Sequence, residues 1–316
     1  MIDVLITASL SEPVRERVAK AVREGGGRPV FRTVAQLKEL ECEPEVIFGN
    51  VPVDFVIGQK RLRWLQTVSA GVDGLAARAG ELPPGLVITN GSGVYGPAGG
   101  DHVMAMILYF TRGLGHYTRA QLRRAWAPDI RRMSRLLGQT LVVLGLGDLG
   151  QNVARRAKAF GMRVIGVKRT PGDVEGVDRV VTLAALDAVL PEANHLAITL
   201  PLTPATRGLL DRRRLALLPK GAFVYNIGRG AIIDEEALVE ALQSGHLGGA
   251  GLDVFVNEPL PADHPLWTFE NVLITPHLGA NTPRDHDVAA EIFIPNWHRW
   301  RSGEPLQNVV DLQLGY

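Results

Sequence analysis

The chain has 316 residues, of which 34 are basic and 33 acidic, and it contains a single cysteine. At roughly 100–200 residues per domain, this length predicts two domains. A hydrophobic content of 46% with 21% charged residues excludes an intrinsically disordered chain. The near-neutral charge gives no reason to expect nucleic acid or an anionic membrane as a partner. The lone Cys42 excludes an internal disulfide framework and a cysteine-based metal site.

No stretch of the sequence predicts membrane insertion or export. The longest uninterrupted apolar run, Val103–Phe110, has eight residues, far fewer than the roughly 20 that a membrane span needs. The N-terminus MIDVLITAS reads as a first strand and not as a signal peptide. We therefore expect a soluble, cytoplasmic protein.

Short β-rich runs alternate with amphipathic stretches in the first part of the chain. A helix is expected from Ser11 or Glu12, with Pro13 in its first turn, to the glycines at 25–27. This alternation indicates a parallel sheet that is covered by helices on both faces. The predicted strands are Asp3–Thr7, Val46–Phe48, Leu65–Val68 and Val87–Thr89.

The composition changes at Asn90–Gly100, where five of eleven residues are glycine. Two interpretations stay open, a surface loop or a hinge before a helix at Asp101–Thr111. A second α/β series then begins, with helices expected at Gln151–Phe160, Glu235–Ser244 and about 283–301. Its predicted strands are Leu141–Leu144, Arg163–Val167, His195–Thr199, Ala222–Asn226, Gly251–Val254 and Val272–Ile274.

These elements predict an α/β fold with two doubly wound, parallel-sheet (Rossmann-like) domains and a cleft between them. Residues 98–279 form the predicted dinucleotide-binding domain. The last helix is long enough to return to the first domain. Residues 1–97 and 280–316 therefore form the predicted flavodoxin-like, substrate-binding domain.

A dinucleotide-binding motif follows the predicted strand Leu141–Leu144. Gly145, Gly147 and Gly150 form a G-x-G-x-x-G pattern before an apolar helix. The first glycine permits a tight turn, the second lets a pyrophosphate approach the backbone, and the third lets the helix pack close to its strand. The following strand at Arg163–Val167 supplies the context that the motif requires.

The residues after that second strand indicate which dinucleotide binds. An NAD site places Asp or Glu there to bond the ribose 2′-hydroxyl, whereas this chain has Lys168, Arg169 and Thr170. A carboxylate repels a 2′-phosphate, and an arginine binds it with paired, charge-assisted hydrogen bonds. The alternative is a solvated basic turn that tolerates NAD. We expect NADP(H) as the preferred cofactor, with NAD(H) possible.

Several motifs occur in the order found in the D-isomer-specific 2-hydroxyacid dehydrogenases, and the chain resembles this family over nearly its whole length. Its closing PLQNVVDLQLGY and its Lys168–Arg169 pair are most similar to the NADPH-dependent glyoxylate/hydroxypyruvate reductase branch. The resemblance implies an oxidoreductase that transfers hydride between NADP(H) and a small 2-keto acid, giving a D-2-hydroxy acid. The motifs are SAGVDGL at 69–75, LPLTPATRGL at 200–209, NIGRG at 226–230, DVFVNEPLP at 253–261 and TPHLG at 275–279.

The resemblance also implies three catalytic residues. Arg229 would bind the substrate carboxylate and polarise the 2-keto oxygen, for which a permanently charged planar fork of donors is suited. His277 would protonate the carbonyl oxygen as hydride arrives and act as the base in the reverse direction. Glu258 would pair with His277, favour its imidazolium form and hold the ring in place. No metal is expected, because Arg229 and His277 supply the electrophilic assistance.

Further contacts are implied by the same resemblance. The backbone of Ala70, Gly71 and Val72 would cradle the substrate carboxylate. Asp253 would contact the nicotinamide amide, and Thr206 would lie near the cofactor phosphates. The remaining cofactor contacts are expected from Asp148, Leu149, Leu200, Pro201, Ile227 and Gly279.

Some positions depart from the family pattern or carry no role in it. Asp148 stands where many relatives carry Arg, so its acid must point away from the pyrophosphate. Tyr95 stands where relatives often have Asn, which leaves substrate contacts there open. His102 is expected to be structural. Arg119–Arg135, with six arginines and Trp126, matches the arm through which family members dimerise, so a homodimer is expected; binding of nucleic acid is the disfavoured alternative.

Two other functions remain as alternatives on this scaffold. A dinucleotide-sensing, corepressor-like regulatory protein shares the fold, and some such proteins retain the same three residues. Phosphite oxidation also uses them, whereas a formate dehydrogenase is disfavoured because that branch has Gln where Glu258 stands.

Overall fold

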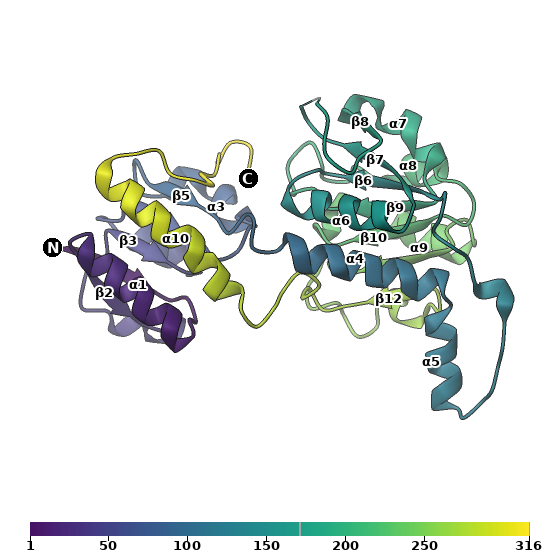
Figure 1. The fold of residues 1–316 in the computed structure, drawn as a ribbon, viewed down its shortest axis with the longest axis horizontal. Coiled ribbons are helices and arrows are strands. Elements are labelled where there is room, and N and C mark those ends of the chain that lie inside the picture. The colour runs from purple at the N-terminus through teal and green to yellow at the C-terminus, as the bar shows by residue number, and fades with distance from the viewer. Residues whose placement is uncertain (171, 316) are drawn as a thin grey trace. The chain divides into compact units, whose positions relative to one another are not determined.

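The computed structural model describes residues 1–170 and 172–315, which form two compact units. The first unit combines Met1–Tyr95 with the chain from Thr282 onward, and the second is Gly96–Asn281. The predicted boundaries were at 97–98 and 279–280. Each unit is a parallel sheet with helices on both faces (Figure 1), which confirms the predicted fold class of two doubly wound α/β domains.

The first unit has a five-stranded sheet in the order β2-β1-β3-β4-β5, with every pairing parallel. Neighbouring side chains on β1 point to opposite faces, as the two-residue period of a strand requires. Val4 and Ile6 pack under α1 and α10, whereas Leu5 packs under α2 and α3. The strands are β1 (Ile2–Ile6), β2 (Gly27–Phe31), β3 (Val46–Phe48), β4 (Trp64–Gln66) and β5 (Val87–Thr89); the helices are α1 (Glu12–Glu24), α2 (Val53–Gly58), α3 (Asp73–Ala77) and α10 (Asp285–Ser302).

Trp297 of α10 fixes the C-terminal helix on the first sheet. The side chain is fully buried, and its indole N–H donates to the carbonyl oxygen of Ala21 at 2.9 Å. A Cβ atom on Gly25 would lie 2.3 Å from the indole nitrogen, and one on Gly27 would lie 3.0 Å from the ring carbons. The glycines that end α1 therefore make room for a tryptophan from the other end of the chain.

The second unit has a seven-stranded parallel sheet in the order β12-β11-β10-β9-β6-β7-β8. On β6, Leu141 and Val143 face α4 and α6, whereas Val142 and Leu144 face α7, α8 and α9. The strands are β6 (Thr140–Leu144), β7 (Arg163–Val167), β8 (Arg179–Val181), β9 (His195–Ile198), β10 (Phe223–Asn226), β11 (Gly249–Leu252) and β12 (Val272–Ile274); the helices are α4 (Gly96–Thr111), α5 (Leu114–Leu122), α6 (Asp148–Ala159), α7 (Leu186–Val189), α8 (Arg212–Leu217) and α9 (Glu235–Gln243).

The structure differs from the predicted elements in several places. The strands β2 and β8 were not predicted; β2 contains a glycine and a proline, which are unfavourable in a strand. The predicted strands Leu65–Val68 and Gly251–Val254 begin one and two residues earlier, as Trp64–Gln66 and Gly249–Leu252. The glycine-rich stretch 90–100 is helical from Gly96. A Cβ on Gly99 would lie 2.9 Å from Leu149, and one on Gly100 would lie 3.0 Å from the Asn152 backbone, so these glycines allow α4 to pack closely on α6.

Helices in both units are short or of mixed polarity. The longest of those described, α10, has 18 residues and carries acidic groups in its first turn and arginines in its last. Over residues 1–170 and 172–315, no helix combines the length and the hydropathy that crossing a bilayer requires.

His195 is a buried titratable group at the start of β9. Its ring stacks on that of Phe223, its Nδ1 lies 3.0 Å from the Tyr225 hydroxyl, and its Nε2 lies 2.5 Å from Oε1 of Gln139. Burial lowers the pKa of His195 to about 4. The folded chain therefore holds a neutral ring at a pH where the unfolded chain, with a histidine pKa of about 6.5, begins to protonate it.

We expect His195 to reduce the stability of the fold as the solution is acidified. Below about pH 6.5 the unfolded chain binds a proton that the folded chain accepts only near pH 4, so unfolding is increasingly favoured between these values, by about 3 kcal/mol at most. His195→Phe lowers stability at neutral pH, because it removes two hydrogen bonds, but it abolishes this proton uptake. The difference in urea midpoint between variant and wild type should narrow from about pH 7.5 to about pH 5.

His298→Gln on the exposed face of α10 is the control for that comparison. Its difference from wild type should stay constant over the same pH range. A constant difference for His195→Phe as well would contradict the burial argument.

Candidate active site

The glycine loop after β6 has the geometry of a dinucleotide cradle. Gly145 has a φ of +97°, which favours glycine. A Cβ on Gly150 would lie 1.9 Å from the Gly145 carbonyl oxygen, so no larger residue fits there, whereas a Cβ on Gly147 would meet no atom within 4 Å. The backbone at Gly147 therefore faces open space, where a pyrophosphate can approach. All three positions fit the requirements of the motif.

The start of α6 complements this loop. The helix begins at Asp148, and no side chain caps it, so the N–H groups of its first turn are available to an anion. The Asp148 carboxylate accepts hydrogen bonds from the Gly96 N–H at 2.7 Å and from the Asn152 amide at 3.1 Å. The acid is thus turned toward Gly96, the first residue of α4. The contact of the Asp148 backbone with a pyrophosphate stays a prediction.

The basic residues Lys168 and Arg169 follow β7, the strand beside β6. The Gly145 N–H donates to the Val167 carbonyl oxygen at 2.9 Å, which places the end of β7 directly next to the glycine loop. Lys168 is half-buried, and Arg169 and Thr170 are exposed. These three residues therefore stand at the edge of the sheet where the ribose of a dinucleotide lies in folds of this type.

The other predicted cofactor residues line the same edge on the opposite side of β6. Leu200 and Pro201 follow β9, and Ile227 follows β10 as a buried residue. The Thr206 hydroxyl donates to the Pro201 carbonyl oxygen at 2.7 Å and accepts from the Thr203 N–H at 2.8 Å. Thr206 thus shapes the loop after β9. The side chain of Leu149 packs under α4 at Gly99, and the contacts of these residues with a cofactor stay predictions.

Arg229 is carried by a short loop after β10. Asn226 fixes this loop, because its Oδ1 accepts from the Gly228 N–H at 3.1 Å and its Nδ2 donates to the Arg229 carbonyl oxygen at 2.9 Å. Arg229 itself is half-buried, and its Nη1 donates to the Gly228 carbonyl oxygen at 2.8 Å. A Cβ on Gly230 would lie 2.0 Å from the carbonyl carbon of Phe255, so glycine is needed for this loop to contact the one that carries Glu258.

His277 and Glu258 form the pair that the motifs predicted. His277 Nδ1 lies 2.7 Å from Glu258 Oε2, and Oε1 of Glu258 accepts from the Phe255 N–H at 2.9 Å. His277 has a φ of +55°, which is uncommon for a residue other than glycine and is often found at functional sites. Because Nδ1 faces a carboxylate, it carries a proton, and Nε2 is the nitrogen that remains for exchange.

Asp253 organises the loop on which His277 stands, a role that the motifs did not reveal. The residue is 2% exposed. One of its carboxylate oxygens accepts from the Thr275 hydroxyl at 2.6 Å and the Leu278 N–H at 3.2 Å, and the other accepts from the Gly279 N–H at 3.0 Å. The His277 N–H donates to the Asp253 carbonyl oxygen at 2.8 Å. The predicted contact of Asp253 with the nicotinamide amide stays a prediction.

His102 of α4 supports the same loop. Its Nε2 lies 3.1 Å from the Thr275 hydroxyl oxygen, and a Cβ on Gly279 would lie 2.4 Å from its ring. Both contacts are structural. Gly279, predicted as a cofactor contact, is therefore also the residue that lets the loop pack against α4.

The predicted substrate residues Ala70, Gly71 and Val72 belong to the first unit, in the loop after β4. Asn90 donates to the Ala70 carbonyl oxygen at 2.8 Å, and the Ser69 hydroxyl donates to the Gly71 carbonyl oxygen at 3.0 Å. These bonds engage the carbonyl groups of Ala70 and Gly71 with side chains of the same unit. The Tyr95 hydroxyl donates to the Val68 carbonyl oxygen at 3.2 Å, and burial raises the pKa of Tyr95 to about 12, so this tyrosine also braces the loop.

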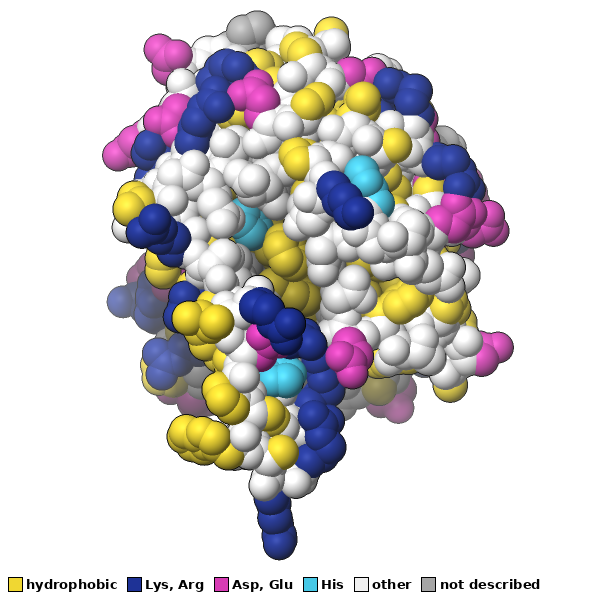
Figure 2. All heavy atoms as spheres, turned by 90° about the vertical axis from the view of Figure 1, so that its right-hand side faces the viewer, with side chains coloured by type: hydrophobic (Ala, Val, Ile, Leu, Met, Phe, Trp, Pro, Cys, Tyr) yellow, Lys and Arg dark blue, Asp and Glu magenta, His cyan; other side chains and the backbone are white. Residues whose placement is uncertain are grey.

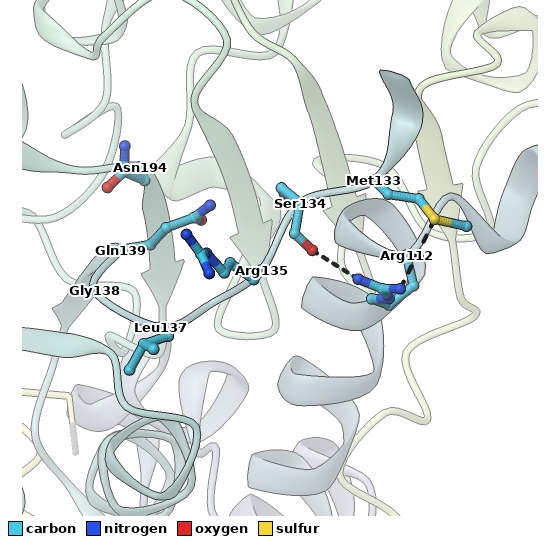
Figure 3. Close-up of a pocket in the computed structure, with 8 residues that line it drawn as sticks. All are labelled: Arg112, Met133, Ser134, Arg135, Leu137, Gly138, Gln139 and Asn194. Atoms are coloured by element: carbon cyan, nitrogen blue, oxygen red, sulfur yellow. Dashed lines mark hydrogen bonds between the residues drawn. The ribbon is translucent and has the colours of Figure 1, made fainter. Parts of the chain in front are cut away.

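One cavity of the second unit is lined by Glu258 and His277, and another lies away from them. One of about 460 Å³ lies beside His277 and Glu258, with apolar walls from Phe255, Leu260 and Trp267. Another of about 630 Å³ is lined by residues that precede β6 and β9 and by Arg112, directly after α4 (Figure 3). That position is the amino edge of the sheet, so the second cavity lies at the opposite end of the strands from the glycine loop and does not belong to the candidate site.

The three loops with Arg229, Glu258 and His277 follow β10, β11 and β12, which are neighbours in one parallel sheet. The glycine loop follows β6, where the chain turns first to β7 on one side and later to β9 on the other. Ligands of doubly wound sheets bind outside the carboxyl ends of the strands at such a switch point. The fold therefore gathers every predicted residue of the second unit at one edge.

Comparison with known proteins gives the same assignment. The family model of the D-isomer specific 2-hydroxyacid dehydrogenase, NAD binding domain, matches residues 104–279. The chain is 32% identical to D-3-phosphoglycerate dehydrogenase of Methanocaldococcus jannaschii over 99% of its own length, and it spans 60% of the length of that protein. It is 33% identical to glyoxylate/hydroxypyruvate reductase A of Serratia proteamaculans, covering 98% of this chain and 95% of the relative.

A solved structure extends the similarity to the whole fold. The D-isomer specific 2-hydroxyacid dehydrogenase from Xanthobacter autotrophicus Py2, in complex with NADPH and MES, superimposes with a TM-score of 0.86 at 33% identity, and the match covers 99% of both chains. The family model, the relatives and the solved structure agree. The chain belongs to the D-isomer specific 2-hydroxyacid dehydrogenase family.

Proposed function

We propose that this enzyme reduces a small 2-keto acid, glyoxylate or hydroxypyruvate, to the corresponding hydroxy acid with NADPH. The observation that carries the proposal is the His277–Glu258 pair at 2.7 Å on loops adjacent to that of Arg229, at the same sheet edge as the glycine loop. The similarity to glyoxylate/hydroxypyruvate reductase A of Serratia proteamaculans supports the substrate class. The single cysteine supports a reducing, cytoplasmic location.

The residues of the site divide the reaction between them. Arg229 binds the substrate carboxylate and stabilises the negative charge that develops on the 2-keto oxygen. His277 donates the proton on Nε2 to that oxygen, and solvent then reprotonates the nitrogen. Glu258 accepts a hydrogen bond from Nδ1 and so holds the ring with Nε2 free to face the substrate. The nicotinamide, when bound, supplies the hydride that adds to C2.

Two observations support NADP(H) over NAD(H). Lys168 and Arg169 stand where NAD-specific folds carry an acid, and an acid would repel a 2′-phosphate. The similar structure from Xanthobacter autotrophicus Py2 contains NADPH. NAD(H) remains usable, because the glycine loop and the start of α6 contact the part of the cofactor that both dinucleotides share.

The proposal is tested by the loss of nicotinamide absorbance on mixing NADPH or NADH with glyoxylate or hydroxypyruvate. Turnover with NADPH supports it. Tight NADPH binding without turnover of any 2-keto acid would instead support a dinucleotide-sensing regulator. Formation of reduced cofactor from NADP and phosphite would support phosphite oxidation on the same residues.

Replacing the proton donor should abolish most of the chemistry and leave cofactor binding intact. We expect His277→Gln to lower kcat by about 10²–10⁴-fold, the contribution of a positioned acid. The dissociation constant of NADPH, measured by fluorescence, should stay within about twofold, because Nε2 acts on the substrate. His246→Gln, whose ring contacts the Leu215 carbonyl oxygen, is the control. An equal loss of activity in both variants would refute the assignment.

The cofactor preference should depend on Arg169. We expect Arg169→Asp to lower kcat/KM for NADPH by more than about tenfold, because the acid repels the 2′-phosphate, with no comparable loss for NADH. Arg163→Ala is the matched control, since Arg163 begins the strand that Arg169 follows and pairs with Glu192 at 2.8 Å. Equal losses with the two cofactors would show that Arg169 does not contact the 2′-phosphate.

We further propose a homodimer formed through the arm made by α5 and residues 123–135. Leu122, Trp126 and Ile130 are 81%, 98% and 83% exposed, and large apolar side chains so exposed are typical of contact surfaces. Figure 2 shows hydrophobic side chains gathered with basic ones on this part of the second unit. Ion pairs join Asp129 to Arg131 and Arg132, so part of the positive charge of the arm is compensated locally.

Acidic substitutions at the exposed apolar positions of this arm should dissociate the dimer. We expect light scattering to give twice the chain mass for wild type and one chain mass for the double variant Leu122→Asp, Trp126→Asp, since burying two carboxylates in an apolar contact is costly. Val34→Asp, at a half-exposed apolar position of the first unit, should remain dimeric. A wild type that elutes as a monomer would overturn the proposal.

A further inference from the structure

A polar cavity lies within the first unit, at the carboxyl ends of β1 and β2. Its volume is about 370 Å³. The strands pair in parallel with Ile6 opposite Phe31, so the loops that leave them emerge side by side. The lining comes from the loop Thr7–Leu10, from Arg15 on α1, and from Phe31, Arg32, Thr33 and Gln36 after β2.

Two arginines face this cavity without a carboxylate partner. The Arg15 guanidinium lies over the Phe31 ring, 4.2 Å from its centroid, and Arg32 Nη1 donates to the Phe31 carbonyl oxygen at 2.8 Å. Within residues 1–170 and 172–315, no acidic side chain forms an ion pair with either. Two positions along the same helix, Arg17 pairs with Glu291 at 2.8 Å.

Arg28 on β2 repeats the contrast, because it pairs with Asp3 at 2.6 Å. Arg17 and Arg28 are therefore neutralised by carboxylates, whereas Arg15 and Arg32, which line the cavity, are exposed and have none among the described residues. No acidic residue contributes to the lining. The Asp287 carboxylate accepts from the N–H of Ser11, the residue after the cavity loop, at 2.9 Å.

Hydroxyl groups also reach the cavity. Ser9 and Thr33 bring them to the lining, and that of Thr33 donates to Oε1 of Gln36 at 3.2 Å. The Ser9 N–H donates to Nδ1 of His286 at 2.7 Å, and the Thr33 N–H donates to Oε1 of Gln36 at 2.9 Å. These bonds fix the loops after β1 and β2, so the cavity is shaped by backbone that is held in place from both sides.

The topology makes this edge a place where ligands bind. The strand order β2-β1-β3-β4-β5 is that of flavodoxin-like sheets, in which ligands bind outside the carboxyl ends of the strands at the switch point between β1 and β3. The cavity lies at the same edge of the sheet, one strand to the side, over β1 and β2. The loop with Ala70, Gly71 and Val72 follows β4, which is two strands from β1 and three from β2. At about 4.8 Å per strand, the cavity lies roughly 10–14 Å from that loop, so it is separate from the predicted substrate contacts.

We propose that this cavity binds a phosphate group, as inorganic phosphate or as a small phosphate ester. Two guanidinium forks that approach from α1 and from β2 suit a doubly charged, tetrahedral group with several acceptor oxygens. A carboxylate has one charge and two oxygens in a plane, and it satisfies one fork. The site is independent of the reductase reaction and requires no cofactor.

The proposal is tested by isothermal titration of the full-length protein with inorganic phosphate and with glycerol 3-phosphate. NADPH is present at saturation, so that phosphate contacts in the second unit are occupied. We expect one ligand per chain with a dissociation constant below roughly 1 mM. Tighter binding of the ester identifies an organic phosphate as the ligand, and equal binding identifies the free ion.

Variants locate the site. Arg32→Gln and Arg15→Gln should each weaken phosphate binding by more than about tenfold, whereas Arg23→Gln, in the last turn of α1, should leave it unchanged. Arg32→Lys, which keeps the charge but loses the fork, should give an intermediate affinity. Urea midpoints check that each variant is folded; Arg32→Gln removes only a bond to a carbonyl oxygen and keeps the test decisive if Arg15→Gln is destabilised.

Three outcomes overturn the proposal. One is the absence of saturable binding by either phosphate probe. Another is binding that is unchanged in both arginine variants, which would place the phosphate elsewhere. The third is displacement of phosphate by an equal concentration of acetate, which would make this a carboxylate site.

Discussion

The buried carboxylate of Asp253 holds together the loop that carries His277, the proposed proton donor. It accepts from the Thr275 hydroxyl and from the N–H groups of Leu278 and Gly279. A buried charge is tolerated when hydrogen bonds replace its hydration. Because these donors lie on both sides of His277, satisfying Asp253 also fixes the loop after β12 and directs the imidazole to Glu258. The geometry of the proposed proton donor thus follows from the solvation of a residue that stands after the preceding strand, β11.

Glycines also let the loop of Arg229 pack closely against the loops beside it. Gly230 allows the Arg229 loop to touch the backbone of Phe255, whose N–H in turn donates to Glu258. Gly228 similarly lies against the Leu200 carbonyl oxygen, where a Cβ would approach within 2.7 Å. The loop of Arg229 therefore lies against the loops after β9 and β11 through backbone contacts that leave no room for a Cβ atom. This constraint explains the two glycines that flank Arg229, and the chemistry of the arginine alone would not.

The sequence predicted the parts of this arrangement that depend on local patterns. The runs 46–48, 87–89, 163–167 and 272–274 are strands with the predicted bounds, because buried parallel strands are short and continuously apolar. The Glu258–His277 pair was predicted from its motifs. The bonds of Asp253 and of His102 to Thr275 were not, since they join segments far apart in the chain. The strand β2 was missed because glycine and proline are unfavourable in strands. Gly27 is needed there to make room for Trp297, a contact with a distant part of the chain that the local sequence does not reveal.

Both units carry basic residues at the same position of their sheets, although the loops beside those residues differ. In each, a basic residue directly follows the second strand of a doubly wound sheet: Arg32 after β2, and Lys168 with Arg169 after β7. In both units that position is beside the loop that leaves the first strand, where anions are bound in such folds. Only the second unit has a glycine loop that lets a pyrophosphate reach the backbone. The first has the hydroxyl-bearing loop Thr7–Ser11 instead, which suits a single phosphate held by side chains and does not suit a dinucleotide.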